Sequence, residues 1–288
     1  PSAVFLIPSV KILVFGAGAV GSLLGGFLAR AGHEVSFVGR AGHLDCVERD
    51  GLRITGLWGN HLARPFRCYR KAAEISKNGP PFDLILLTVK SFDTECAAKT
   101  VAALMGEETI LVSFQNGLGN VEAITAVIPE NQYLAGRIIT GVELAPGTVE
   151  VTVSADDLAV GALPGARPRQ DPEEIARLLR EADIPARGVD DILAVLWSKV
   201  IYNCALNGIC SVLEIPYGGI LDRPDTKASM ERIVHECYAV AARKGVRLHP
   251  PSSGAYLSLL KEKLIPSTAS HYPSMLRDLK KGRRTEID

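Results

Sequence analysis

Three polar residues, Lys199, Asn203 and Asn207, interrupt the apolar run from Ile192 to Cys210 at intervals of four. Residues four apart on an α-helix lie one turn above another, so these three form one narrow stripe. A solvated helix face is broader and rich in charged residues, and a buried Asn without a partner is costly. The spacing therefore predicts a helix that turns an ammonium and two amides toward a polar cavity. The alternative is a stripe satisfied by internal hydrogen bonds to another domain.

The chemistry of this stripe fits the reduction of a carbonyl group. A lysine in such a cavity can protonate or polarise a carbonyl oxygen as hydride arrives, and its charge stabilises the developing alkoxide. The two amides can hold a hydroxyl or a carboxylate without adding net charge. This combination indicates a reductase of 2-oxo acids.

A second constellation lies near the N-terminus, where a GxGxxG motif comprises Gly16, Ala17, Gly18, Ala19, Val20 and Gly21. The motif directly follows the β-rich run Lys11–Phe15 and opens a helical pattern over Ser22–Ala31. In this context the glycines allow a tight turn and close approach of a pyrophosphate, and the helix N-terminus attracts the anion. We predict that these six residues bind a dinucleotide. The alternative is a strand–helix turn without a ligand.

The residues after the second predicted strand, Glu34–Val38, distinguish NADP from NAD. Enzymes that use NAD place an acid there, which accepts hydrogen bonds from the ribose hydroxyls. This chain has Arg40, 24 residues after Gly16, and the nearest acid, Asp45, lies further on. A guanidinium suits the 2′-phosphate of NADP, so we predict NADP(H) as the cofactor. A solvated loop arginine is the alternative.

Two further polar residues come after apolar runs that predict buried strands. Lys90 directly follows Phe82–Val89, and Asn116 follows Thr109–Phe114 with one residue, Gln115, between them. Ligands of parallel α/β sheets bind beyond the carboxyl ends of the strands, so we predict that both residues belong to the dinucleotide site. A solvated strand end and an Asn-Gly turn are the alternatives.

The elements around these residues predict two domains. The first half alternates strand and helix patterns, which predicts a parallel sheet covered by helices. From Leu134 the runs "GTVEVTV" and "DLAVGAL" predict an antiparallel addition to that sheet, and Asp171 is the predicted N-cap of a following helix. After Asp190 only helical patterns occur, over Ile192 to about Val212, Thr226–Arg243, Gly254 to about Lys263 and Pro273 to about Lys281. The predicted fold is an α/β Rossmann-type N-terminal domain, residues 1–189, and a mainly α-helical C-terminal domain, residues 190–288.

Composition and charge exclude several classes of protein. The 288 residues carry 32 Lys plus Arg and 32 Asp plus Glu, so no net charge favours nucleic acid or an anionic membrane. The six cysteines are scattered without a CxxC pair, which argues against a disulfide framework and a metal site. Ile12–Ala29 lacks charge, but its five glycines favour a strand, turn and helix over a membrane span. Together with an N-terminus that lacks the basic residues of a signal peptide, this predicts a soluble, cytoplasmic protein.

The motifs together resemble the ketopantoate reductase family (2-dehydropantoate 2-reductases) over nearly the full length. The resemblance rests on "GAGAVG", "VGR", "TVKS", "QNGLGN", "LWSKVIYNCALN" and "SMLRDLKKGRRTEID". The last two are the most specific, because common dinucleotide folds do not share them. The resemblance implies NADPH-dependent reduction of ketopantoate to pantoate, on the way to pantothenate and coenzyme A, in a cleft between the domains.

The resemblance also implies roles for individual residues. Lys199 matches the proton donor, and Glu286 matches a catalytic acid that closes over the cleft and contacts cofactor or substrate. The implied substrate-binding residues are Asn116, Asn203, Asn207 and Ser274. The implied cofactor contacts, beyond the glycine motif and Arg40, are Lys90, Asn116, Glu286 and the backbone of Val142.

Two departures from the family pattern bear on these expectations. Tyr217-Gly218 stands where some members have Asn-Gly, at a position that contacts substrate in the family. The sequence also ends at Asp288, where members usually continue with another helix, so we expect Glu286 to be poorly anchored.

Two other functions stay open. One is an NADP-dependent enzyme that acts on another small acid, either a reductase of a 2-oxo acid or an enzyme acting on a 3-hydroxy acid, and the other is a non-catalytic NADP-binding sensor. The expected partner is a small-molecule 2-oxo acid, with neither nucleic acid nor membrane, and the sequence is compatible with a homodimer.

Overall fold

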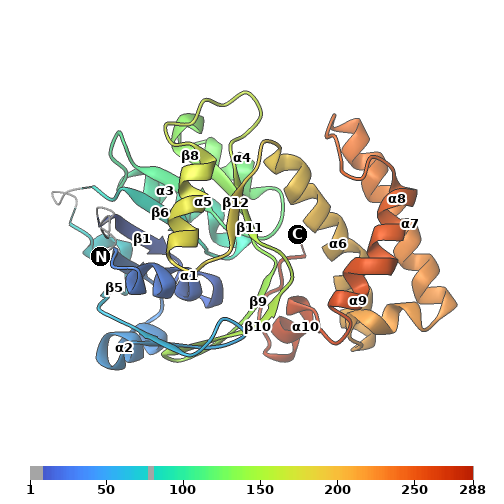
Figure 1. The fold of residues 1–288 in the computed structure, drawn as a ribbon, viewed down its shortest axis with the longest axis horizontal. Coiled ribbons are helices and arrows are strands. Elements are labelled where there is room, and N and C mark those ends of the chain that lie inside the picture. The colour runs from blue at the N-terminus through green and yellow to red at the C-terminus, as the bar shows by residue number, and fades with distance from the viewer. Residues whose placement is uncertain (1–8, 77–80, 288) are drawn as a thin grey trace, which may run out of the picture. The chain divides into compact units, whose positions relative to one another are not determined.

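The computed structural model describes residues 9–76 and 81–287, and these form two compact units. The first unit contains the chain up to Val189, apart from two short segments. The second unit begins at Asp190 and also takes in those segments, Lys90–Phe92 and Asn116–Asn120. Figure 1 shows the strands in the blue-to-yellow part of the chain and only helices in its orange and red part.

The first unit is built on an eight-stranded sheet. In spatial order its strands are β12 (Ala186–Gly188), β11 (Leu158–Gly161), β8 (Tyr133–Arg137), β7 (Ile110–Ser113), β6 (Leu84–Leu87), β1 (Lys11–Phe15), β2 (Glu34–Val38) and β5 (Arg67–Tyr69). Neighbouring strands are parallel except β8 and β11. The chain runs from β1 to β2 on one side and returns to β6 on the other. The carboxyl ends of β1 and β6 are therefore the point where such sheets bind ligands.

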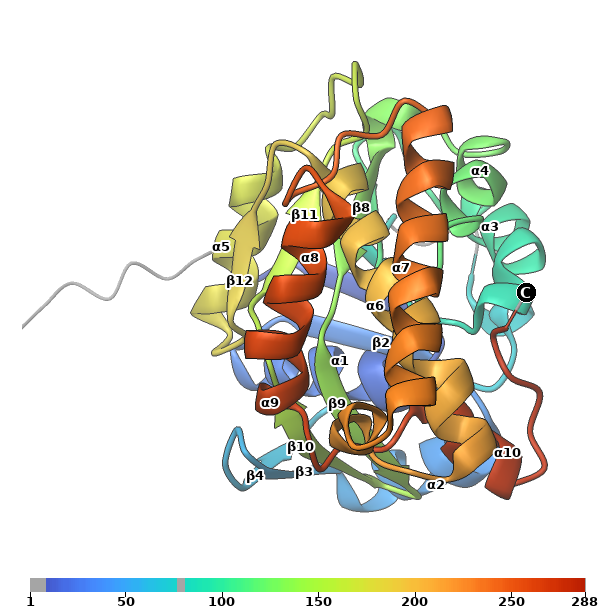
Figure 2. The same ribbon diagram turned by 90° about the vertical axis from the view of Figure 1, so that its right-hand side faces the viewer.

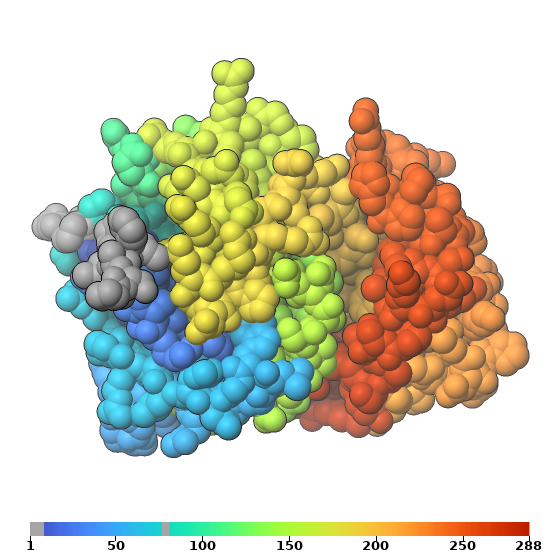
Figure 3. Space-filling model, viewed as in Figure 1, coloured from blue at the N-terminus to red at the C-terminus, as the bar shows by residue number. Residues whose placement is uncertain are grey.

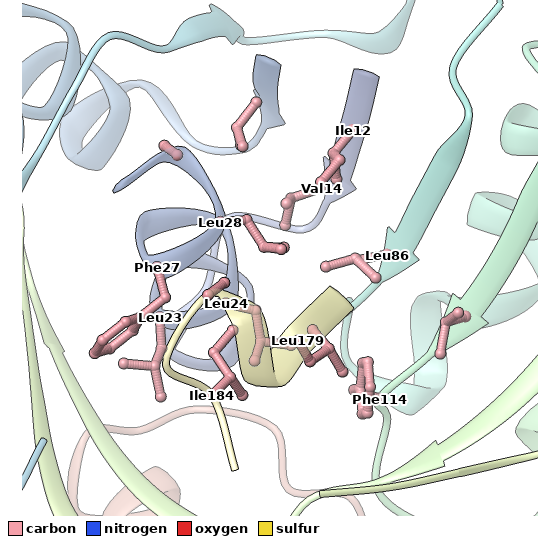
Figure 4. Packing of buried hydrophobic residues seen from close by; sticks show 14 of the residues in the cluster. Ile12, Val14, Leu23, Leu24, Phe27, Leu28, Leu86, Phe114, Leu179 and Ile184 are labelled. Carbon is pink, nitrogen blue, oxygen red and sulfur yellow. The ribbon is translucent and has the colours of Figure 1, made fainter. Parts of the chain in front are cut away.

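Helices cover both faces of this sheet because its central strands are apolar on both sides. On one face α1 (Ala19–Arg30) and α5 (Pro172–Glu181) share a core with the strands, in which Leu24 and Leu179 lie side by side (Figure 4). In Figure 2, α3 (Thr94–Ala102) and α4 (Asn120–Thr125) lie on the other side of the sheet from α5. The remaining helix of this unit is α2 (Ala41–Asp50).

A second, four-stranded sheet packs against α1. Its order is β4 (His61–Ala63), β3 (Leu52–Gly56), β10 (Thr148–Ser154) and β9 (Thr140–Ala145). In the space-filling view, α5 (yellow) and the β3–β4 segment (light blue) leave little of α1 (dark blue) visible (Figure 3). α1 is thus an interior helix, which explains why residues 21–29 of this short helix are all buried.

The second unit is a set of helices around α6 (Ile192–Leu213). α7 (Pro224–Arg243) packs against α6, α8 (Ser253–Leu259) packs against α7, and α10 (Ser274–Lys280) returns to α6. A π-helical turn (Leu260–Leu264) and α9 (Ile265–Ser267) continue α8. Short 3₁₀ helices lie elsewhere in the two units, and they are η1 (Ala72–Glu74), η2 (Ser91–Asp93), η3 (Glu130–Gln132) and η4 (Tyr217–Leu221).

Among the described residues, α6 alone is long and apolar enough to span a membrane by length and composition. Its buried side chains, including Trp197, Ile201 and Leu206, form the core of the helical unit with residues of α7 and α8. The same side chains account for its apolar composition. The run Ile12–Ala29 is divided between β1 and α1, as its glycines predict.

Most predicted elements are confirmed, with corrections at their limits. The helix predicted from Ser22 begins at Ala19, because the motif's last residues already form its first turn. The strands predicted over Phe82–Val89 and Thr109–Phe114 are shorter at both ends. The helix predicted to end near Lys263 continues through the π-helical turn to Ser267.

The prediction of an antiparallel addition to the main sheet is half right. β11 does join the main sheet antiparallel to β8. The "GTVEVTV" run, which forms β10, instead belongs to the second sheet, antiparallel to β9 and parallel to β3. The expectation was wrong because the partner strand β3 lies far earlier in the chain and has no strong strand pattern.

Candidate active site

The glycine-rich loop leaves the carboxyl end of β1 in a conformation that requires glycine. The N–H of Gly16 donates to the carbonyl of Val38 at 3.0 Å, and φ at Gly16 is +112°. A Cβ on Gly16 would lie 2.8 Å from the carbonyl carbon of Thr88, and one on Gly21 would lie 2.3 Å from the oxygen of Gly16. At Gly18 the nearest atom to such a Cβ is 4.0 Å away. The loop is thus closed against the sheet at two glycines and open at the third.

The open side of the loop is also the N-terminus of α1. Gly18 is the N-cap and supplies no side-chain acceptor, and the first turn contains no acid. The N–H groups of Ala19, Val20 and Gly21 therefore have no partner within the helix. These donors and the open space at Gly18 fit the pyrophosphate of a dinucleotide.

Arg40 and its surroundings fit a 2′-phosphate better than a ribose diol. Arg40 follows β2 at the start of α2, its side chain is exposed, and no described carboxylate pairs with it. The nearest acid, Asp45, accepts from Nη2 of Arg70 at 2.5 Å, and Glu48 accepts from the same nitrogen at 2.7 Å. Arg70 thus neutralises Asp45 and Glu48 and leaves the charge of Arg40 available to an anion.

In the second unit, the side chains of Lys90 and Glu286 form an ion pair. Nζ of Lys90 lies 3.0 Å from Oε2 of Glu286 and 3.0 Å from Oδ2 of Asp278, and the N–H of Ser91 donates to Oε1 of Glu286 at 2.9 Å. Burial lowers the pKa of Lys90, but the charges and hydrogen bonds of Glu286 and Asp278 outweigh it and raise that pKa. The expectation that Glu286 is poorly anchored is therefore wrong, because these donors hold its carboxylate.

The polar stripe of α6 is half-buried, and two of its residues have partners within the same unit. Nζ of Lys199 donates to Oδ1 of Asn116, whose backbone oxygen accepts from Nδ2 of Asn120 at 2.7 Å. Oδ1 of Asn207 accepts from the hydroxyl of Tyr217 at 2.7 Å. Both predicted substrate residues, Asn116 and Asn207, are thus oriented by neighbouring side chains.

The remaining stripe residue and Ser274 present polar groups without a partner among the described residues. Asn203 is half-buried on α6, between the turns that carry Lys199 and Asn207. Ser274 is exposed at the first residue of α10, which packs against α6. Within the helical unit, one ammonium, three amides and one hydroxyl are therefore carried on α6, α10 and the Asn116 segment.

Val142 is placed apart from these groups. It lies in β9 opposite Val151 of β10, and its side chain packs against the core of the first unit. No described hydrogen bond or ion pair joins it to the glycine loop, Arg40 or Lys90. Its predicted backbone contact to the cofactor stays a prediction.

Three residues of this arrangement were missed from the sequence. Asp278 pairs with Lys90, Arg70 engages the acids of α2, and Thr88 donates from its hydroxyl to the oxygen of Gly16 at 2.8 Å. Asp278 and Arg70 look like surface charges in their helical and loop segments. Thr88 alone carried a signal, because it lies in the "TVKS" motif directly before Lys90.

The first unit carries groups that can bind a phosphorylated dinucleotide, and the second unit carries groups that can protonate a carbonyl. Uncapped helix N–H groups and a free guanidinium attract phosphates. An ammonium oriented by an amide oxygen can donate a proton to a carbonyl. Side-chain amides and a hydroxyl bind carboxylates without further charge. This set of groups suits the reduction of a small oxo acid.

Known proteins that are similar to this chain are reductases of such an oxo acid. The family "Ketopantoate reductase PanE/ApbA" matches residues 12–165, and "Ketopantoate reductase PanE/ApbA C terminal" matches residues 191–288. The 2-dehydropantoate 2-reductase of Aquifex aeolicus is 37% identical over 282 residues, which are 97% of this chain and 87% of the relative.

Solved structures of similar proteins share the fold. A PanE/ApbA family ketopantoate reductase from Ralstonia eutropha has a TM-score of 0.83 at 30% identity, covering 96% of this chain and 88% of that one. D-mandelate dehydrogenase, solved with NADH and anilino(oxo)acetate, has a TM-score of 0.84 at 26% identity with the same coverage. These similarities confirm the predicted α/β and helical architecture. The chain belongs to the PanE/ApbA ketopantoate reductase family.

Proposed function

We propose that this protein reduces 2-dehydropantoate (ketopantoate) to pantoate with NADPH, a step toward pantothenate and coenzyme A. The protein is an oxidoreductase of the ketopantoate reductase family, and its relatives bear the name 2-dehydropantoate 2-reductase. The observation that carries the proposal is Lys199, an ammonium on an otherwise apolar helix, bonded to the Asn116 amide and followed at intervals of four by two more amides.

The first unit supplies the cofactor site. When bound, NADPH supplies the hydride that reduces the ketone. The N–H groups at the start of α1 and the open space at Gly18 receive its pyrophosphate, and Arg40 receives the 2′-phosphate. The engagement of Asp45 and Glu48 by Arg70 favours NADPH over NADH, because no free acid remains there to bind a ribose diol.

Lys199 is the proton donor in this proposal. Its ammonium hydrogen-bonds the substrate ketone, draws electron density toward the oxygen and delivers a proton to it as the carbon is reduced. Asn116 orients the ammonium through Oδ1 without neutralising it. Proton donation by a positioned lysine and stabilisation of the growing negative charge are the two contributions of this residue.

The remaining residues hold the substrate and close the site. Asn203, Asn207 and Ser274 present the amides and hydroxyl that bind the carboxylate and hydroxyl groups of the substrate. Glu286, held by Lys90 and Ser91, is the acid that exchanges these partners for cofactor or substrate hydroxyls. Lys90 then keeps Asp278 as a partner, so its charge stays balanced.

A reductase of another small 2-oxo acid is the second candidate. Tyr217 stands where some family members have an amide, and it places an aromatic ring beside Asn207. D-mandelate dehydrogenase, which carries an aryl-substituted oxo acid analogue in its solved form, has the same fold at 26% identity. A non-catalytic sensor is disfavoured, because a sensor has no use for a proton donor on an apolar helix.

The setting of this reaction is also a proposal. A cytoplasmic location fits the six cysteines, all of which are free thiols in the structure. The partner is a small 2-oxo acid, and a homodimer is compatible with this proposal. Neither a nucleic acid nor a membrane has a part in the reaction.

The direct test follows NADPH absorbance after addition of ketopantoate, with NADH in a parallel reaction. Rapid loss of NADPH and slow loss of NADH are the expected result, and Arg40→Ala should narrow that difference. Pyruvate, phenylglyoxylate and other 2-oxo acids, each assayed separately, distinguish the second candidate. Binding of NADPH without turnover of any oxo acid would contradict both reductase proposals and favour the sensor.

A further inference from the structure

The amide of Asn207 is held in one orientation by Tyr217. The Tyr217 hydroxyl donates to Oδ1 of Asn207 at 2.7 Å, and the ring is only 5% exposed. Burial, more than the nearby Tyr202 and Cys210, raises the pKa of the Tyr217 phenol, so it stays protonated and acts as a donor. The oxygen end of the Asn207 amide is therefore occupied by a hydrogen-bond donor of the protein itself.

The position of this hydroxyl is fixed by its surroundings. The Tyr217 ring packs edge-to-face against Tyr202, with centroids 5.6 Å apart at 87°, and lies 5.4 Å from the ring of His271. The backbone N–H of Tyr217 donates to the backbone carbonyl of His271 at 3.0 Å. The hydroxyl of Tyr202 is bonded elsewhere, to Thr268 at 2.6 Å, so it does not compete for Asn207.

The nitrogen end of the same amide is left for a ligand. Among residues 9–76 and 81–287, no acceptor is found for Nδ2 of Asn207, and the residue is half-buried. An unfilled donor favours a ligand that accepts hydrogen bonds, such as a carboxylate. An Asn without a fixed neighbour could instead turn either end toward a ligand.

We propose that Tyr217 is a positioning residue, which holds the Asn207 amide so that its NH₂ group donates to the carboxylate of the 2-oxo acid. This role rests on the proposed function. In this role Tyr217 contributes to substrate recognition through Asn207. It differs from the asparagine that some relatives have at this position, which contacts the substrate directly. All 2-oxo acids share this carboxylate, so Asn207 would bind it in the same way whichever 2-oxo acid is the substrate.

A double-mutant cycle on the substrate KM tests this role. Tyr217→Phe removes only the hydroxyl, and we expect KM to rise about 3- to 10-fold with kcat little changed, as for loss of one hydrogen bond. In an Asn207→Ala background the same substitution should change KM by less than about twofold, because Tyr217 acts through Asn207. Tyr202→Phe is the matched control and should leave KM within about twofold in both backgrounds.

Asn207→Asp tests the direction of the hydrogen bond. Its carboxylate still accepts from Tyr217 but presents a negative oxygen to the ligand, so KM should rise more than in Asn207→Ala. Wild-type KM in Asn207→Asp, or additive effects of Tyr217→Phe and Asn207→Ala, would overturn the proposal.

Urea unfolding of the ligand-free variants keeps this test separate from that of the proposed function. The destabilising effects of Tyr217→Phe and Asn207→Ala should be non-additive, since both remove the same hydrogen bond. Additive unfolding effects would refute the inference even if the enzyme is active. A wild-type protein that turns over no 2-oxo acid, yet shows the unfolding coupling, would refute the proposed function and with it the substrate role of Tyr217.

Discussion

At the residue scale, the two lysines of the candidate site differ in their partners. Lys90 is held by the carboxylates of Glu286 and Asp278, which balance its charge. Lys199 donates to Oδ1 of Asn116, a neutral acceptor that orients the ammonium without removing its charge. The bond to Asn116 supports the proposed role of Lys199 in proton donation, and the ion pairs of Lys90 support a role in binding and in holding Glu286.

This difference predicts the effect of removing Lys199. Lys199→Ala should lower kcat/KM for the accepted oxo acid about 10²- to 10⁴-fold, the usual contribution of general acid catalysis. The Kd for NADPH, measured by quenching of protein fluorescence, should change little. Cys204→Ala, at an exposed position of the same helix, is the control for disturbance of α6. Activity of Lys199→Ala within about twofold of wild type would exclude Lys199 as the proton donor.

At the element scale, two glycines of the β1–loop–α1 unit, Gly18 and Gly21, have different functions. A methyl group on Gly21 would lie 2.3 Å from the oxygen of Gly16 and 2.4 Å from Oγ1 of Thr88, so the helix could not approach the strand as it does. A methyl group on Gly18 meets open space, and φ there is −83°, which alanine adopts readily. One glycine is thus required for packing and the other for access to the loop.

These positions form a matched pair of substitutions. Gly21→Ala should destabilise the protein by about 1–3 kcal/mol through overpacking. Gly18→Ala should leave the urea midpoint nearly unchanged and raise the Kd for NADPH, because its methyl group would stand at the proposed site of the pyrophosphate. Urea unfolding and NADPH titration of both variants provide the measurements. Equal destabilisation by the two substitutions, with equal loss of NADPH affinity, would contradict this division of roles.

The elements that sequence predicts well are those specified locally. "KILVF" and "EVSFV" form β1 and β2 over the predicted residues, and Asp171 caps α5 by accepting from the N–H of Glu173 at 2.8 Å. The short strands β3, β4 and β5 were not predicted. They contain polar residues, and β3 pairs with β10, nearly a hundred residues later, so no local pattern reveals them.

The same limit applies to the candidate site. The spacing of Lys199, Asn203 and Asn207 on one helix face could be read directly, because helical periodicity is local. Asp278 and Lys90 are separated by 188 residues, and Lys199 and Asn116 by 83, so their pairing depends on the fold. Sequence therefore identified candidate residues for the chemistry, but the partners that hold these residues could not be predicted from it.

At the scale of the whole molecule, a buried histidine links three segments of the first unit. Nδ1 of His43, on α2, accepts from the N–H of Gly147 at 3.1 Å, in the turn between β9 and β10. Its Nε2 lies 2.9 Å from the hydroxyl of Ser22 on α1. Because Nδ1 is an acceptor, the ring must be neutral, and a proton on Nδ1 would break the bond to Gly147.

This link predicts that mild acid destabilises the protein. Burial lowers the pKa of His43, outweighing the Ala145 carbonyl, which raises it. A histidine whose folded-state pKa lies below its unfolded value of about 6.5 binds more protons when unfolded. The neutral ring's contribution is therefore fully present above about pH 6.5 and is lost as the pH falls toward the folded-state pKa. Thermal midpoints measured from pH 8 to about pH 5.5 should fall accordingly.

Substitution of His43 separates this contribution from that of every other group that titrates in the same range. His43→Asn keeps an oxygen near the position of Nδ1 to accept from Gly147 but cannot be protonated. Its thermal midpoint should start lower, because the bond to Ser22 is lost, and should fall less on acidification. His33, whose pKa burial also lowers, accounts for part of the remaining slope. Parallel pH profiles for wild type and His43→Asn would show instead that the His43 link does not govern acid sensitivity, and that groups elsewhere do.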